Sequence, residues 1–521
     1  VRLLYVMISM SNEVNRGKRI VKNTLLLYIR MILLMLISLY TSRVILNALG
    51  VVDYGIYNVV GGVVTMFSMI SGSLSTAISR FLTFAIGKND NDSLNNIFST
   101  SVNIQFVLSF IILLIAETLG LWFLHAKMVI PESRMIAAFW VYQFSLMAFI
   151  INLISIPYNA VIIAHERMSA FAYISILEAV GKLAISMCIV ISPIDKLIFY
   201  AFLVVILGLI IRITYGVYCK RNFKEAEYHL IIDKSLLKKM FGFAGWNFLG
   251  SSSMILREYG GNIIINLFCG PAVNASRAIA TKVNSTVQGF ITNFTMAINP
   301  QITKSYASGD YDYMLNLIFK GSRFSFYMML FLSLPIILNA DYVLSLWLGI
   351  VPEYAITFVC LILVLAMVDI LSNSLITTIL ATGKVRTYQI VVSSIQFLNI
   401  PISYVFLWLG YSPASVIIVA IVLSNIALFV RLYMISKYIP IRIIAFIKSV
   451  YINVIVVALL SSIFPCLLKL YTNNGFTGFV FTSLCSMCCT IFMVFFVGCT
   501  KTERDFLRKK IVVVIKTKLT K

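Results

Sequence analysis

The sequence is short of charged residues and of histidine. Only 12% of its 521 residues are Asp, Glu, Lys or Arg, and three are histidines. A soluble globular chain is about 25% charged and about 45–50% apolar, whereas this chain is 60% hydrophobic and has a mean hydropathy of +0.95. A soluble fold must expose a large share of its residues to water. The composition therefore excludes a soluble protein and places most of the chain in lipid.

The histidines, the cysteines and a missing nucleotide-binding motif limit the chemistry that the chain can perform. Three histidines supply little for a zinc site, and the nine cysteines are scattered through apolar runs. Cys485, Cys488 and Cys489 have no His or carboxylate nearby, which favours apolar filler over metal ligands. No G-x-x-x-x-G-K-[ST] run is present, which excludes ATP hydrolysis by that route. We expect no metal and no cofactor, and transport driven by an ion gradient, the membrane potential or the substrate gradient.

The net charge of +22 comes from 42 basic and 20 acidic residues. On a soluble fold such an excess indicates nucleic-acid binding. Here the charge lies in short hydrophilic pieces between apolar runs, so membrane topology explains it better. We expect no nucleic-acid partner.

Apolar runs of about 20 residues are candidate membrane-spanning helices, and about fourteen follow one another along the chain. Membrane strands need only about 9–11 alternating residues, so the length of the runs indicates helices. The predicted spans are 24–46, 56–84, 99–124, 135–156, 168–191, 196–219, 242–268, 273–300, 316–338, 354–379, 385–409, 413–436, 447–469 and 476–499. The predicted fold class is an all-α polytopic membrane protein.

Basic residues gather in alternate loops, for example around Lys88, Arg167 and Lys220–Lys239. The positive-inside rule then places both termini in the cytoplasm, as an even number of spans requires. The longest inner loop divides two sets of six spans. The predicted organisation is a cytoplasmic N-terminal segment, an N-lobe, an inter-lobe loop, a C-lobe, two further spans and a basic cytoplasmic tail, at 1–23, 24–219, 220–241, 242–436, 437–499 and 500–521.

Two spans carry polar side chains at steps of three and four residues, which places each series on one helix face. The series share an offset of about 220 positions, which indicates two related halves. Packing of small residues between helices is one explanation, and it suffices for much of the first series. A water-filled cavity explains the larger residues of the second series better. The expected cavity-lining residues are Thr65, Ser68, Ser75, Thr281, Ser285, Gln288, Thr292 and Asn299.

Charged side chains inside spans are costly and mark cavities or ion pairs. Arg257, Arg277 and Lys282 lie too deep to reach the headgroups easily, so we expect them to bind substrate. Cations outnumber carboxylates in this set, which predicts an anionic cargo such as a pyrophosphate. The carboxylates Glu258, Asp369 and Glu178 are candidates for ion coupling, although Glu178 is also spaced to pair with Lys182.

The run SLYTSRVILNALGVVDYGIYNVVGGVVTMFSMISGSLSTAISRFLTFAIGKND (Ser38–Asp90) closely resembles the start of bacterial polysaccharide flippases of the Wzx type, and NRGKRIVKNTLLLYIRMILLML (Asn15–Leu36) does so too. These flippases belong to the multidrug/oligosaccharidyl-lipid/polysaccharide (MOP) exporter superfamily. The resemblance implies a MATE-like fold of two six-helix lobes plus two C-terminal helices. Spans one, two, seven and eight would line a cationic cavity, with Arg30 and Arg43 as further candidates beside Arg257 and Arg277. For Arg30 and Arg43, contact with lipid headgroups is as good an explanation as a place in the cavity.

The resemblance also implies a function. The cargo would be an undecaprenyl-pyrophosphate-linked oligosaccharide, moved across the bacterial inner membrane by alternating access for O-antigen, lipopolysaccharide or capsule synthesis. Membrane lipids, and the polymerase and chain-length regulator of the same pathway, would be its partners. An ion-coupled multidrug or cation antiporter of the same superfamily is the alternative. A membrane-embedded enzyme fits less well, because no long loop or acidic cluster is visible, and we expect no catalytic residues.

Overall fold

The structure is a computed structural model, and every regular element in its described residues is helical. It describes residues 23–505 except 39, 42–43, 46, 51–52, 54–55, 58–59, 61–67, 127–129, 193, 231–232, 349–350 and 473–474.

Within these described residues, ten helical segments are long and apolar enough to cross a membrane. They coincide with predicted spans three to six and nine to fourteen. The segments are Asp92–Gly120, Glu132–Ala164, Met168–Cys188, Lys196–Asn222, Tyr311–Leu338, Ala355–Thr382, Val385–Trp408, Ser415–Ser436, Ile443–Tyr471 and Phe476–Gly498. The other predicted spans fall on the helix Asn23–Ser38, on α2 (Ser68–Lys88) and on α8 (Lys234–Ser308). The expectation of an all-α polytopic membrane protein is confirmed.

The helix α8 covers two predicted spans, although it is helical throughout Lys234–Ser308. A straight helix would separate Gly261 from Arg277 by about 24 Å. A guanidinium nitrogen of Arg277 instead lies 2.5 Å from the position that a Cβ atom of Gly261 would occupy. The chain therefore reverses direction between these residues, so α8 has two legs.

The chain divides into two compact units. Unit 1 comprises Val1–Ser251 and Met296–Gly309, and unit 2 comprises Ser252–Thr295 and Asp310–Lys521. The long helix α8 contributes to both, because its first and last residues belong to unit 1 and its middle belongs to unit 2.

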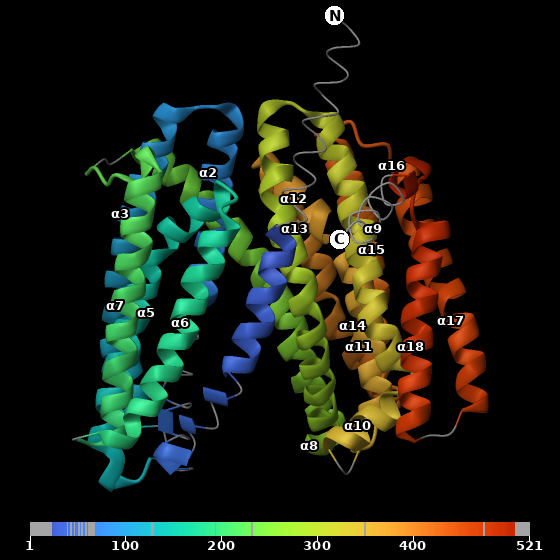
Figure 1. Cartoon of the computed structure of the whole chain (residues 1–521), viewed down its shortest axis with the longest axis horizontal. Coiled ribbons are helices and arrows are strands. Elements are labelled where there is room, and N and C mark those ends of the chain that lie inside the picture. Colours follow the sequence, from blue (N-terminus) through green and yellow to red (C-terminus); the bar gives the residue numbers. More distant parts are fainter. Residues whose placement is uncertain are drawn as a thin grey trace, which may run out of the picture. The chain divides into compact units, whose positions relative to one another are not determined.

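In unit 1, α5 packs against α2, α3, α6 and α7, and Figure 1 shows α3, α5, α6 and α7 running alongside one another. Short helices connect these long ones. The bounds are α3 Asn91–Ile115, η1 Ala116–Gly120, α4 Leu121–Ala126, η2 Glu132–Arg134, α5 Met135–Ala164, α6 Met168–Cys188, η3 Ile189–Ile191, α7 Lys196–Asn222 and η4 Lys224–Ala226.

In unit 2, α9 packs against α11, α17 and α18, and α15 packs against α11, α13 and α14. Two of the predicted spans are interrupted, because α11 ends just before α12 begins and α13 ends just before α14 begins. The bounds are α9 Tyr311–Leu338, α10 Ala340–Leu348, α11 Ala355–Ile370, α12 Asn373–Thr382, α13 Val385–Phe397, α14 Asn399–Trp408, α15 Ser415–Ser436, α16 Ile443–Phe446, η5 Ile447–Ile452, α17 Asn453–Tyr471, α18 Phe476–Met493 and η6 Val494–Gly498.

Aspartates outside the apolar runs begin several helices. The side chains of Asp195 and Asp233 accept hydrogen bonds from the first free amides of α7 and α8. Such caps satisfy amides that have no partner within the helix. Gly309 ends α8 at a φ of +76°, a conformation that glycine adopts without steric cost.

Arg134 clamps two loops of unit 1. It forms ion pairs with Asp53 and with Asp195, the latter with Nη1 2.5 Å from Oδ2. Burial raises the pKa of Asp195, but the hydrogen bonds from Arg134 and from the start of α7 lower it by more, so the net pKa is below its ordinary value. The clamp therefore favours the ionised carboxylate.

Candidate functional site

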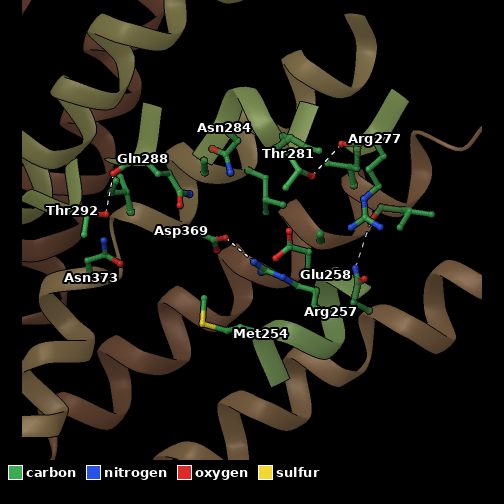
Figure 2. Close-up of a pocket in the computed structure, with 18 residues that line it drawn as sticks. Met254, Arg257, Glu258, Arg277, Thr281, Asn284, Gln288, Thr292, Asp369 and Asn373 are labelled. Carbon is green, nitrogen blue, oxygen red and sulfur yellow. Dashed lines mark hydrogen bonds and ion pairs between the residues drawn. The ribbon is translucent and has the colours of Figure 1, made fainter. Parts of the chain in front are cut away.

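Unit 2 encloses a cavity of about 270 Å³ between the two legs of α8 and the helices α11, α12, α14 and α15. Figure 2 shows its polar side chains converging from both legs of α8 and from α11 and α12. Many of its other lining residues are apolar, such as Ile362 and Ala420. A cavity with a few convergent polar groups among apolar ones is the usual form of a small-ligand site.

The second leg of α8 presents one polar face to this cavity. Arg277, Thr281, Asn284, Gln288 and Thr292 line it at steps of three and four residues. The Thr281 hydroxyl donates to the Arg277 carbonyl, and the Thr292 hydroxyl donates to the Gln288 carbonyl. The hydroxyl proton of each threonine is therefore already bonded, and the hydroxyl oxygen is left as an acceptor in the cavity.

Arg257, on the first leg of α8, is held by three partners. Its Nη2 atom lies 2.9 Å from Oδ2 of Asp369, and its Nη1 atom donates to Gln396 at 2.9 Å and to Ser424 at 3.0 Å. The Arg257 and Asp369 side chains are 13% and 22% exposed. The pair thus fixes both side chains and largely neutralises the charge of Arg257.

Arg277 contrasts with Arg257. It is only 8% exposed, and within the described residues its Nε and Nη1 atoms have no hydrogen-bond partner. Its nitrogens lie so close to Gly261 that a side chain there would collide with them. An arginine buried with free donors beside a cavity is costly unless something binds it.

The cavity lining carries two arginines and two carboxylates, Glu258 and Asp369. The sequence predicts a surplus of positive charge, whereas these formal charges balance. Asp369 is bound to Arg257. Glu258 has no ion pair among the described residues and is an electrostatic neighbour of Arg277. The Glu258 carboxylate therefore offsets part of the charge that Arg277 presents.

The other expected site residues lie elsewhere. Lys282 and Ser285 are exposed and outside the lining, and Asn299 belongs to unit 1. Ser75 is partly buried in α2, of Ser68 only the backbone is described, and Arg43 and Thr65 lie outside the described residues. Arg30 and Glu178 line a second cavity, which is in unit 1.

The sequence does not predict several residues that line the cavity or bind Arg257, namely Asn284, Asn373, Gln396, Asn399 and Ser424. Asn284 lies seven residues after Arg277 and two turns along the same face, a signal that the sequence contains. The residues on α12 to α15 join the site only through packing of helices distant in sequence. Within the described part of the chain, no three His, Cys, Asp or Glu side chains gather as a metal site would require.

Three comparisons with known proteins bear on identity. The family described as polysaccharide biosynthesis protein matches residues 20–306, and no curated protein matches the chain. Among solved structures, a MATE transporter in the bent conformation superposes with a TM-score of 0.71 at 14% identity, covering 84% of this chain and 97% of that one.

Two further structures share the fold. A multidrug resistance MATE family transporter of the MOP superfamily, in an outward-facing conformation, has a TM-score of 0.69, and a MOP superfamily transporter from Pyrococcus furiosus has 0.68. Each is 14% identical and covers 83% of this chain and 96% of its own. The chain therefore belongs to the polysaccharide biosynthesis protein family, as its resemblance to Wzx-type flippases predicts, and is a multi-pass membrane transporter with the MATE fold.

Proposed function

We propose that the protein is a flippase that moves an undecaprenyl-pyrophosphate-linked oligosaccharide across the bacterial inner membrane by alternating access. Family membership supports a polysaccharide precursor as cargo. The observation that carries the proposal is Arg277, whose guanidinium lines a cavity with two donors free among the described residues. The positive-inside pattern supports cytoplasmic termini.

Arg277 binds the pyrophosphate. A guanidinium donates two parallel, charge-assisted hydrogen bonds to phosphate oxygens, and such bonds are strongest where water is scarce. The anion would lie beside a guanidinium whose Nε and Nη1 atoms have no partner among the described residues. Arg257 has the supporting role, since Asp369, Gln396 and Ser424 already accept hydrogen bonds from three of its five donors.

Glu258 couples anion binding to a cation. The Glu258 carboxylate competes with the pyrophosphate for Arg277, and a cation bound at Glu258 would relieve that competition. Cation binding and anion binding therefore strengthen each other, because linkage is reciprocal. Asp369 is a weaker coupling candidate since it is already paired with Arg257.

Reconstitution tests the proposal. Purified protein in proteoliposomes should translocate lipid-linked oligosaccharide extracted from the source bacterium. Arg277→Gln should reduce the rate about a hundredfold, which corresponds to about 2.7 kcal/mol. Lys282→Gln is the matched control, because Lys282 lies on the same helix but outside the cavity. No translocation above protein-free liposomes, or equal rates for both variants, would contradict it.

A cation antiporter is the second candidate, and the two carboxylates in the cavity favour it. In that case the same proteoliposomes would accumulate a cationic dye against an ion gradient, and Glu258→Gln would abolish uptake. The flippase proposal expects no dye uptake above that of protein-free liposomes.

A further inference from the structure

Unit 1 contains a cavity of its own, of about 440 Å³. It lies between α5, α6 and α7, with Arg30 and Tyr57 contributed by the preceding part of the chain. Its volume falls within the range of roughly 300–1,000 Å³ that is usual for small-ligand sites. None of its lining residues lies in the cavity of unit 2.

Helical periodicity builds one polar wall of this cavity. Along α5 the lining includes Ser145, Phe149, Asn152, Ser155 and Asn159, at steps of three and four residues. A lipid-facing wall would be apolar, because unsatisfied polar groups are costly in a membrane. This face of α5 is therefore shaped for a polar occupant.

Of the three charged residues that line this cavity, two form an ion pair with each other and the third lies against an aromatic ring. Lys182 and Glu178 pair at 2.7 Å across one turn of α6. Arg30 lies over the Phe171 ring, 4.4 Å from its centroid. Most remaining polar groups of this cavity are neutral amides and hydroxyls, unlike the four charged groups in the cavity of unit 2.

Two buried polar atoms in this lining lack a partner among the described residues, namely Oδ1 of Asn159 and Nε of Arg30. One is an acceptor and the other a donor. Leaving both unsatisfied costs free energy, about 1–3 kcal/mol for the neutral amide oxygen and more for the charged guanidinium. A ligand that both donates and accepts hydrogen bonds would satisfy the two together.

We propose that the cavity of unit 1 is a carbohydrate-binding site. Sugar hydroxyls donate and accept at once, as asparagine amides do, and an aromatic ring such as that of Phe149 can pack on the apolar face of a sugar ring. Of the three charged groups in this lining, Lys182 and Glu178 pair with each other and Arg30 lies over an aromatic ring, so a ligand meets mainly neutral polar groups. A lipid tail would leave the amides unsatisfied. The inference rests on the proposed function, because the sugar is the oligosaccharide of the lipid-linked cargo.

The test uses two probes on the same purified protein. The first is the free oligosaccharide that mild acid releases from the lipid-linked pool of the source bacterium, detected by saturation-transfer NMR. The second is inorganic pyrophosphate, detected by calorimetry. The variants are Asn159→Leu, Asn152→Leu and the double change. Asn159→Leu removes an acceptor that bonds to nothing in the described residues, so the fold should tolerate it.

Asn293→Leu is the matched control, because Asn293 also lies in a membrane helix but lines neither cavity. We expect the double variant to weaken oligosaccharide binding at least tenfold while pyrophosphate binding stays unchanged, and the control to match the wild type. Arg277→Gln should do the reverse. Wild-type protein that does not bind the oligosaccharide, or a double variant that binds it normally, overturns the inference. Oligosaccharide binding without pyrophosphate binding supports this inference and contradicts the pyrophosphate role of Arg277.

Discussion

The ion pair between Arg257 and Asp369 should contribute a measurable coupling free energy to the stability of unit 2. The perturbation is a double-mutant cycle made of Arg257→Gln, Asp369→Asn and the double variant. In the structure, Nη2 and Oδ2 are 2.9 Å apart, and both side chains are mostly buried. The cycle isolates the interaction of the two groups from their separate contributions.

Two estimates bound the magnitude. Two unit charges 4 Å apart interact with about 4 kcal/mol at an effective dielectric constant of 20. Polar contacts between membrane helices measured by double-mutant cycles average about 0.6 kcal/mol and reach about 1.7 kcal/mol. Because this pair is charged and largely buried, the coupling should lie near the upper measured value, at about 1.5 kcal/mol.

The two single variants should differ. After Asp369→Asn, Arg257 keeps its hydrogen bonds to Gln396 and Ser424. After Arg257→Gln, Asp369 keeps no side-chain partner in the described residues. Arg257→Gln should therefore destabilise the protein more, by about 2–3 kcal/mol, since a lone buried charge is the costly state.

The assay is reversible denaturation of the purified protein in mixed micelles, with unfolding followed by circular dichroism. The pair Glu178 and Lys182 provides the comparison, because both side chains are more than 40% exposed and its coupling should be about 0.3–0.5 kcal/mol. A coupling between Arg257 and Asp369 no larger than that, or a greater loss from Asp369→Asn than from Arg257→Gln, would refute the reasoning.

Three further predictions follow from single positions. Because the folded pKa of Asp195 is lowered, its ionised form stabilises the protein above its unfolded pKa of about 3.9 and loses that effect as the pH falls further; Asp195→Asn should flatten the acid limb of a stability-against-pH curve, and an unchanged limb would contradict this. Gly87→Ala should lower the free energy of unfolding by about 1–3 kcal/mol, since its Cβ would lie 2.7 Å from the Lys304 carbonyl oxygen. Gly72→Ala has open space around its Cβ, so thermal unfolding should find its stability unchanged or raised by up to about 1 kcal/mol. Glu258→Gln should raise the pyrophosphate affinity at constant pH, because it removes the carboxylate that neighbours Arg277; calorimetry that finds an unchanged or weaker affinity would exclude Glu258 as the group that competes for Arg277.

The sequence predicts the membrane-spanning helices well because span length is a local property. Each apolar run of sufficient length forms a helix whatever lies beside it, since the backbone must satisfy its own hydrogen bonds in lipid. The hairpin in α8 is likewise predicted, because two lengths of apolar helix share that segment.

The site is only partly predictable, and Lys282 shows why. Its depth in the membrane alone predicts that it binds substrate together with Arg277. Five residues along a helix turn the side chain by about 140°, so the two point in different directions, and Lys282 lies outside the cavity. This difference in direction can be calculated from the sequence. The pairing of Arg257 with Asp369 cannot be predicted in that way, because 112 positions separate the two residues and only helix packing brings them together.

Direct titration of inorganic pyrophosphate into the purified protein tests the central claim most directly. Wild-type protein and Lys282→Gln should bind it with equal affinity, and Arg277→Gln should lose at least a hundredfold. Binding that survives in Arg277→Gln, or a wild type that takes up no pyrophosphate, would contradict the account of the cavity in unit 2.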